Sequence, residues 1–326
     1  MKKELVRTVN LKKYYPLAKS FIERLLEREV KYVKAVDNVN LEIYEGEVLS
    51  LVGESGSGKS TLGRLILRLI DPTDGRIYFR GRDITNIEGE ELRRIRREMQ
   101  IIYQDPYSSL NPRFRIGDIV GEPLEIHGLA EGSEARRLVI EMLEKVGLTP
   151  GERFYNLYPR DLSGGQRQRV AIARTMIMNP SFIVADEPVS MIDLSLRASI
   201  LDLMMNLREE YNLTILFITH DLSTAYYISD RIAIMYLGRI VEVGNRDQIY
   251  GNPLHPYTQA LLKAIPKPMP GHRESLPLKG EIPNAIDIPS GCRFHPRCPY
   301  IMDRCRVEDP QLIEVEEGHL VACHLY

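Results

Sequence analysis

The chain has 326 residues, of which 44% are hydrophobic and 27% are charged. This ordinary globular composition excludes a chain that is disordered throughout, a collagen-like rod and a coiled coil, and the length allows about two domains. Lys and Arg number 43 against 45 Asp and Glu, and the resulting net charge of −2 argues against nucleic acid as a partner.

No apolar stretch of the sequence reaches the roughly 18 residues that are needed to span a bilayer. The basic N-terminal segment, MKKELVRTVNLKKYYP, lacks the apolar core of a secretory signal. We therefore expect a cytoplasmic protein that reaches a membrane only through a partner.

Residues 1–265 alternate short apolar runs with helix-like stretches, which predicts an α/β fold built on a mainly parallel sheet. The segments 6–9, 36–43 and 76–79 alternate in polarity and are expected to form a smaller antiparallel layer, while 113–160 has helical character. Buried strands of the main sheet are expected where short runs are apolar throughout, at 48–52, 101–103, 182–185, 214–219 and 231–236.

The segment 53–60 reads GESGSGKS and fits the phosphate-binding pattern G-x-x-x-x-G-K-[ST]. It follows an expected strand and precedes an expected helix at 61–70, which favours a phosphate loop over an ordinary Gly/Ser turn. Its backbone N–H groups and the helix N-terminus attract anions, Lys59 can reach the β- and γ-phosphates, and the Ser60 hydroxyl can bind Mg²⁺. The predicted phosphate-binding residues are Gly53, Ser55, Gly56, Ser57, Gly58, Lys59, Ser60 and Thr61.

The apolar run at 182–185 ends in two carboxylates, Asp186 and Glu187. The carboxyl ends of parallel strands form the ligand-binding edge of an α/β sheet. We therefore expect Asp186 to hold Mg²⁺ through water and Glu187 to polarise the water that attacks the γ-phosphate. An acidic pair at a helix N-terminus is the alternative, and the nearby phosphate loop disfavours it.

The segment 162–166 reads LSGGQ and precedes a helix-like stretch. Ser163 and the amides of Gly164 and Gly165 therefore form either a second anion site or an ordinary helix N-cap.

The basic run at 93–97 is interpreted as a solvated helix face rather than a nucleic-acid site, because acidic residues lie among its arginines.

In this order and spacing, the motifs resemble those of ATP-binding cassette (ABC) ATPases. The resemblance implies ATP and Mg²⁺ as ligands, and an α/β fold with a mixed-sheet core, an antiparallel β layer and a helical subdomain at about 113–170. It assigns Gln104 to sensing Mg²⁺ and the attacking water, His220 to hydrogen-bonding the γ-phosphate, and Tyr15 to stacking on adenine, with Tyr14 as the alternative. Residues 190–193, SMID, resemble the D-loop of the family.

In this family the signature segment of one subunit completes the ATP site of another. The resemblance therefore implies that Ser163, Gly164, Gly165 and Gln166 act on ATP that is bound by a second subunit. Neither subunit is then expected to hydrolyse ATP efficiently alone.

Longer segments, among them YQDPYSSLNPR, resemble the second ATP-binding subunit of oligopeptide and dipeptide importers, and residues 252–258, NPLHPYT, match the His-Pro-Tyr element of that family. This resemblance implies an ATPase that powers peptide uptake through two separate transmembrane permease subunits, peripheral on the inner face of the cell membrane. The other implied partners are a paralogous ABC ATPase, or a second copy of this chain, and an extracellular substrate-binding protein. An importer of oligosaccharides and a soluble ABC ATPase of DNA repair or translation are the weaker alternatives.

From Pro266 onward, prolines recur without periodicity, which predicts an extended linker into a C-terminal extension at 266–326 that follows a nucleotide-binding domain at 1–265.

All four cysteines of the chain lie in this extension. Disulfides between them are disfavoured in a reducing cytosol, and a zinc site usually contains closer C-x₂-C pairs. Similar tails in peptide importers carry a 4Fe–4S cluster, which is the predicted cofactor, with Zn²⁺ or thiols that bind no metal as the alternatives. His295, His319 and His324 lie nearby in the sequence and leave a mixed ligand set open. Arg293, Arg297, Arg304 and Arg306 would offset the thiolate charge. The predicted ligands are the four cysteines of the chain, Cys292, Cys298, Cys305 and Cys323, spaced C-x₅-C-x₆-C-x₁₇-C.

Overall fold

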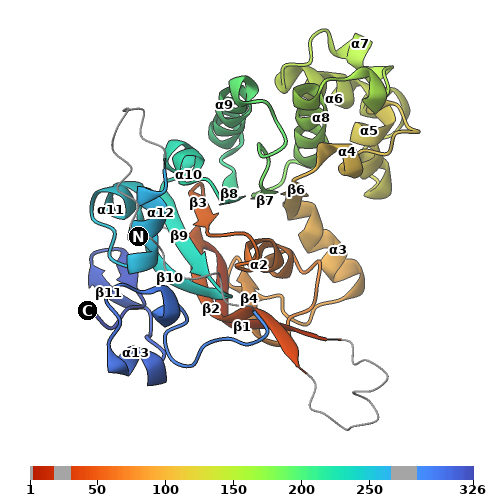
Figure 1. Ribbon diagram of the computed structural model, residues 1–326. Helices are drawn as coiled ribbons and strands as arrows, with labels where there is room; N and C mark the ends of the chain where they lie inside the picture. Colours follow the sequence, from red (N-terminus) through yellow and green to blue (C-terminus); the bar gives the residue numbers. More distant parts are fainter. Residues whose placement is uncertain (1–2, 18–30, 266–284) are drawn as a thin grey trace, which may run out of the picture. The chain divides into compact units, whose positions relative to one another are not determined.

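The computed structural model describes residues 3–17, 31–265 and 285–326 (Figure 1). The chain divides into two compact units, of which the first comprises residues 1–86 and 218–326 and the second comprises residues 87–217. Most of the predicted linker, from Pro266 to residue 284, lies outside the described residues.

An antiparallel sheet begins the first unit. In this sheet, Thr8 lies opposite Leu41 on one side and opposite Ile77 on the other. Val39, Leu41 and Ile43 are buried and alternate with more exposed residues, as expected for a sheet with one covered face. The predicted antiparallel layer is therefore confirmed. Its strands, in the spatial order β2-β1-β4-β5, are β2 (Tyr32–Tyr44), β1 (Glu4–Pro16), β4 (Asp74–Phe79) and β5 (Arg82–Asp83).

The remaining strands of the first unit lie in the order β11-β12-β10-β9-β3. Strands β3 and β9 are parallel, with Leu51 opposite Ala233, and they match the predicted segments 48–52 and 231–236. The pairs β9–β10, β10–β12 and β12–β11 are antiparallel, and strands β10 to β12 were not predicted. The C-terminal extension thus adds strands to the sheet that leads into the phosphate loop. These strands are β11 (Ile313–Glu316), β12 (His319–Val321), β10 (Arg239–Asn245), β9 (Arg231–Tyr236) and β3 (Val48–Val52).

Short helices complete the first unit, and an aromatic cluster joins them to the sheet. Tyr236 at the end of β9 packs against Tyr257 and Phe294, with ring centroids 4.7 and 5.3 Å apart. All three rings are fully buried, so the C-terminal extension contributes to the core of this unit. The helices are α2 (Lys59–Ile66), α10 (Leu222–Ile228), α11 (Arg246–Gly251), α12 (Pro256–Lys263) and α13 (Asp303–Val307), with a 3₁₀ turn η2 at His295–Arg297.

The second unit holds the parallel strands β6 (Met99–Ile102) and β7 (Phe182–Asp186), with Ile101 opposite Val184. The chain returns to the first unit along β8 (Thr214–Thr219), which is buried throughout. These strands confirm the predictions at 101–103, 182–185 and 214–219, and the complete burial of β7 and β8 explains why they are mainly apolar.

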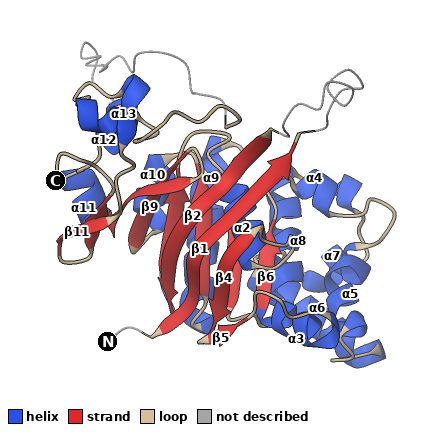
Figure 2. Cartoon of the chain, turned by 90° about the horizontal axis from the view of Figure 1, so that it is seen from below, coloured by secondary structure: helices blue, strands red, loops and turns tan. Residues whose placement is uncertain are grey.

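Helices make up the rest of the second unit (Figure 2). Ile200, Leu203 and Leu207, which recur at helical spacing, form the buried side of α9. On α3, only Ile95 is buried, so the arginine run forms a solvated helix face as predicted. Within the described residues, no helix is both long and apolar enough to cross a membrane. The helices are α3 (Gly89–Glu98), α4 (Pro106–Ser109), α5 (Ile116–Ile126), α6 (Gly132–Lys145), α7 (Gly151–Tyr155), α8 (Gly164–Met176) and α9 (Leu194–Tyr211), with a 3₁₀ turn η1 at Pro159–Asp161.

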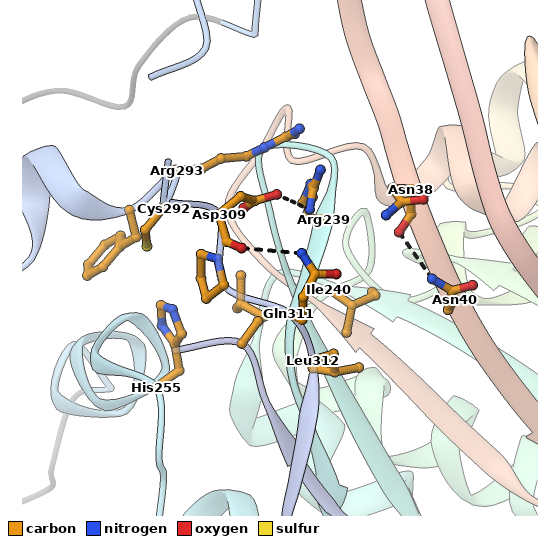
Figure 3. Close-up of a pocket in the computed structure, with 14 residues that line it drawn as sticks. Asn38, Asn40, Arg239, Ile240, His255, Cys292, Arg293, Asp309, Gln311 and Leu312 are labelled. Carbon is orange, nitrogen blue, oxygen red and sulfur yellow. Dashed lines mark hydrogen bonds and ion pairs between the residues drawn. The ribbon is translucent and has the colours of Figure 1, made fainter. Parts of the chain in front are cut away.

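A buried carboxylate on β2 links the antiparallel sheet to the C-terminal extension. Asp37 accepts a hydrogen bond of 2.5 Å from the Tyr14 hydroxyl and forms an ion pair with Arg293. Arg239 lies 3.7 Å from the same carboxylate and also pairs with Asp309 (Figure 3). Burial alone would raise the pKa of Asp37, but the Tyr14 hydrogen bond and the two arginine charges outweigh it, and the pKa lies below its ordinary value of 3.8.

We predict that Asp37→Ala lowers the free energy of unfolding by about 3 kcal/mol, because it leaves buried arginine groups without their partner. Because folding lowers the pKa of Asp37, its contribution is present above the unfolded pKa and is lost as the pH falls through the folded value. Urea titrations at neutral and acidic pH should show a larger acid-dependent loss in the wild type than in the variant, which keeps its other carboxylates of lowered pKa. Asp74→Ala, which breaks the exposed 2.7 Å pair with Lys12, is the control and should change little. Equal effects of the two substitutions would contradict the prediction.

Candidate functional site

The predicted phosphate loop connects β3 to α2 and lies very close to two other strands. Gly58 precedes α2 with a φ of 105°, and a Cβ atom there would lie 2.0 Å from the carbonyl oxygen of Ala35 in β2. A Cβ at Gly53 would lie 2.2 Å from the carbonyl oxygen of Met235 in β9. Both positions therefore require glycine, because the backbone of the loop fits directly against its neighbours.

Lys59 lies inside this loop. Its Nζ donates hydrogen bonds to the carbonyl oxygens of Gly53 (2.8 Å) and Glu54 (2.9 Å), and the residue is 5% exposed. Ser55 and Gly56 form the exposed rim, while the Ser57 carbonyl accepts from the N–H of Gly238 (2.8 Å). An exposed rim of backbone N–H groups, a lysine and a helix N-terminus form an arrangement that can bind a polyphosphate.

The two candidate tyrosines at the end of β1 have different surroundings. The Tyr14 hydroxyl donates a hydrogen bond to Asp37. Burial and this hydrogen bond together raise the pKa of Tyr14. Tyr15 is 38% exposed, and the Lys13 ammonium lies 5.2 Å from its ring centroid. The ring of Tyr15 is thus the more accessible of the two for stacking.

In the second unit, the structure brings Glu187 and Gln104 together. Asp186 is the buried last residue of β7, and Glu187 follows it with a φ of 48°, a left-handed conformation that is uncommon outside glycine. The Gln104 amide donates a 3.0 Å hydrogen bond to Glu187 Oε2. Ser190 closes the turn by donating its N–H and its hydroxyl to the Glu187 carbonyl oxygen, at 3.1 and 3.0 Å. Such local strain is typical of functional sites, and here it fixes the carboxylate beyond the strand end.

The signature segment forms the N-terminus of α8. Ser163 is the N-cap, and its hydroxyl accepts from the N–H of Gln166 (3.3 Å), while Gln166 Oε1 accepts from the N–H of Ser163 (3.0 Å). This reciprocal capping leaves the amides of Gly164 and Gly165 in the first turn of the helix, where anions are favoured. The N-cap and the anion site are thus compatible uses of one segment.

His220 follows β8 and is exposed in the first unit. The next residue, Asp221, caps α10 by accepting from the N–H of Ser223 at 2.9 Å. The predicted ATP residues are therefore divided between the units. The phosphate loop, Tyr15 and His220 belong to the first, and Gln104, Asp186, Glu187 and the signature segment belong to the second.

The cysteines are free thiols in a part of the first unit that we call the cysteine module (residues 292–323). Burial raises the pKa of Cys292 to about 12 and also raises the pKa values of Cys298 and Cys323, with smaller contributions from neighbouring cysteines. Within the described part of the chain, no three His, Cys, Asp or Glu side chains are placed as in a metal site.

A pocket lies between β2, β10 and the cysteine module (Figure 3). Asn38 and Asn40 line it on β2, Arg239 lies on β10, and Cys292, Arg293 and Asp309 line it from the extension. Of the residues predicted for the site, Cys292 is found among the described residues that line this pocket. The pocket is therefore separate in composition from the phosphate loop.

The His-Pro-Tyr element contacts the phosphate loop, and this contact was not predicted from the sequence. His255 caps α12 by accepting from the N–H of Tyr257 (3.0 Å), and burial lowers the pKa of His255 to about 4, which keeps the imidazole neutral. Tyr257 in turn accepts a hydrogen bond of 2.9 Å from the N–H of Glu54, a residue of the loop. Nothing in the local pattern signals this contact, because it joins distant parts of the chain.

Two family models match the chain. The ABC transporter model matches residues 36–190, and the model of the oligopeptide/dipeptide transporter C-terminal region matches residues 241–305. The chain is 47% identical to the oligopeptide transport ATP-binding protein AppF of Bacillus subtilis, over 97% of this chain and 96% of that protein. It is 46% identical to the dipeptide transport ATP-binding protein DppF of Haemophilus influenzae, over 98% of this chain and 96% of that protein.

Solved structures show the same fold. The dimeric ATP-binding cassette MJ0796, bound to ADP and Pi, is 35% identical with a TM-score of 0.64, and the match covers 74% of this chain and 99% of that chain. CbiO1 of Clostridium perfringens, part of an ABC transporter complex, is 25% identical with a TM-score of 0.65, over 77% of this chain and 92% of that chain.

Proposed function

The chain belongs to the ABC transporter family of ATPases, and we propose that it hydrolyses ATP to power the uptake of oligopeptides or dipeptides through separate permease subunits. The match of residues 241–305 to the C-terminal region of oligopeptide/dipeptide transporters carries the assignment of the cargo. This match contains Tyr257, which contacts the phosphate loop, so the family-specific segment is joined to the ATP site.

In the proposed site, the phosphate loop from Gly53 to Thr61 binds the phosphates of ATP and Tyr15 stacks on adenine. Mg²⁺ would be held by Ser60, Gln104 and Asp186, and it would neutralise charge on the β- and γ-phosphates. The hydroxyl, amide and carboxylate oxygens of these residues are ligands suited to Mg²⁺. The inward position of Lys59 supports the site, since its ammonium already lies at the centre of the loop.

Glu187 is proposed to accept a proton from the water that attacks the γ-phosphate. The strained backbone at Glu187 and its 3.0 Å hydrogen bond from Gln104 support this role, because both fix the carboxylate in one orientation. His220 is proposed to donate a hydrogen bond to the γ-phosphate, which carries negative charge during the reaction.

The assembly is proposed to contain two permease subunits, a second ABC ATPase that is a paralogue or another copy of this chain, and an extracellular substrate-binding protein. Ser163, Gly164, Gly165 and Gln166 would act on ATP held by the second ATPase, and the position of this segment at the start of α8, with Ser163 exposed, supports this. The place of action would be the inner face of the membrane. We also propose a nucleotide-binding domain at 1–265, with its helical subdomain at about 113–170, and an extension at 266–326; the match to the ABC transporter model, at 36–190, lies within the first of these ranges.

The four cysteines are proposed to hold a 4Fe–4S cluster, with Zn²⁺ as the alternative, in a structural role. The support for this proposal is the residue type, since cysteine thiolates are the ligands of such clusters and all four cysteines of the chain lie between residues 292 and 323. Their raised pKa values mean that metal binding must displace protons from Cys292, Cys298 and Cys323.

We predict that Glu187→Gln lowers the ATP turnover of the assembled transporter by roughly 10²–10⁴-fold while ATP still binds, because the amide cannot accept the proton. Turnover is measured by phosphate release, and ATP affinity by equilibrium titration. Glu209→Gln, which changes an exposed carboxylate on α9, is the control and should leave both quantities unchanged. Turnover of Glu187→Gln close to that of the wild type would reject this role.

We predict that protein purified without oxygen is brown, with a broad absorption band near about 400 nm from iron–sulfur charge transfer. Replacing Cys292 and Cys298 by serine should abolish the band and the bound iron, as measured by metal analysis. Colourless protein with one zinc per chain would establish the zinc alternative, and metal-free protein would contradict both.

A further inference from the structure

An arginine of the cysteine module holds a carboxylate of the phosphate loop. Arg297 directly precedes Cys298, and its guanidinium forms two hydrogen bonds with Glu54, from Nη1 to Oε2 (2.8 Å) and from Nη2 to Oε1 (3.1 Å). The Arg297 side chain is 6% exposed and the Glu54 side chain 22%. This is a bidentate, largely buried ion pair, which is the most directional form of contact between these two groups.

The surroundings of Arg297 fix it in place. Its guanidinium carbon lies 5.9 Å from the ring centroids of both Tyr236 and Phe294, which belong to the buried aromatic cluster. A guanidinium group is charged at every physiological pH. Arg297 is thus a rigid cation supported by the core of the unit, whereas Glu54 lies on a loop.

Glu54 is held by its main chain as well as by its side chain. Its N–H donates to the Tyr257 hydroxyl oxygen at 2.9 Å, and its carbonyl oxygen accepts from Lys59 Nζ at 2.9 Å and from the N–H of Ser57 at 3.2 Å. The carboxylate that Arg297 holds therefore belongs to the same residue that positions Lys59. A shift of Glu54 would move the ammonium that is expected to meet the phosphates.

Besides holding the loop in position, the ion pair with Arg297 neutralises the negative charge of Glu54. A carboxylate inside a loop that binds a triphosphate repels that ligand unless a cation neutralises it. A buried ion pair gives little net stability, because removing both charges from water costs about as much as their attraction returns. The arrangement is therefore better explained by what it does for the loop than by the stability of the fold.

We propose that Arg297 is a positioning residue for ATP: through Glu54 it neutralises the phosphate loop and holds it in the shape that places Lys59. The inference rests on the proposed function, since it concerns the same ATP site. It gives the C-terminal extension a direct part in nucleotide affinity, in addition to its part in the core.

The test is a double-mutant cycle on the full chain, with the affinity for Mg²⁺-ATP measured by calorimetry in the slowly hydrolysing Glu187→Gln background. Arg297→Gln is expected to weaken ATP binding by about tenfold. In the Glu54→Gln background the same substitution should change the affinity by less than about twofold, because its partner is already gone. Arg297→Lys, which keeps the charge but loses the two-point contact, should lie between the wild type and Arg297→Gln.

Two further measurements separate this role from a purely structural one. In the chain that retains Glu187, Arg297→Gln should raise the KM for ATP and leave turnover at saturating ATP within about twofold, since binding is affected and chemistry is not. Arg304→Gln, which breaks the exposed 2.6 Å pair with Glu308 in the same module, is the matched control and should leave ATP affinity unchanged.

The inference is overturned if Arg297→Gln and Arg297→Lys bind ATP as the wild type does, or if Arg297→Gln has the same effect with and without Glu54. It is also overturned if Arg304→Gln weakens binding equally. Should Arg297→Gln fail to fold, the cycle is run with Arg297→Lys, with the same expectation of a smaller effect in the Glu54→Gln background. A wild-type chain that binds no ATP would instead reject the proposed function itself.

Discussion

The structure of the ATP site depends on the close approach of the phosphate loop to β2 and β9. At Gly58 and Gly53 the loop lies so near the carbonyl oxygens of Ala35 and Met235 that no side chain fits, so its shape follows the position of those two strands. The C-terminal extension holds both strands, through Arg293 and Asp37 on β2 and through the aromatic cluster around Tyr236 on β9. The C-terminal extension therefore holds the same two strands that determine the shape of the phosphate loop.

The sequence predicted those features that are determined locally. Strands β3, β8 and β9 are recognised because they are buried on both faces and hence mainly apolar, and the phosphate loop because its backbone demands glycine at fixed positions. Strand β10 was not predicted because it contains Glu242. This carboxylate is fully buried, whereas a glutamate in a sequence normally indicates an exposed position. Its partner is His319 on β12, whose Nε2 lies 2.8 Å from Glu242 Oε1, and no local pattern indicates a partner so distant along the chain.

The residues of the candidate site also divide into those that the sequence indicates locally and those whose contacts arise only from tertiary packing. Glu187 was predicted from its place after an apolar strand and Gln104 through the resemblance, and the structure joins them by a hydrogen bond within one unit. The arginines beside the cysteines were expected to offset thiolate charge, but Arg293 and Arg297 form ion pairs with Asp37 and Glu54 instead. These pairs come from tertiary packing, which brings a module near the C-terminus to the N-terminal strands. In the proposed mechanism, the extension thus supports nucleotide binding, while the exposed start of α8 is left for the companion ATPase.

The central claim is that the glycine-lined loop of this chain binds a triphosphate whose reaction is completed by the signature segment of a second ATPase subunit. The most direct test is a structure of the assembled transporter with ATP trapped by Glu187→Gln. Our account predicts the γ-phosphate beside Lys59 of this chain and in contact with the signature serine of the companion, and Ser163 of this chain in contact with the nucleotide of the companion. A trapped nucleotide bound away from Lys59, or one whose γ-phosphate is contacted by a single subunit, would contradict it.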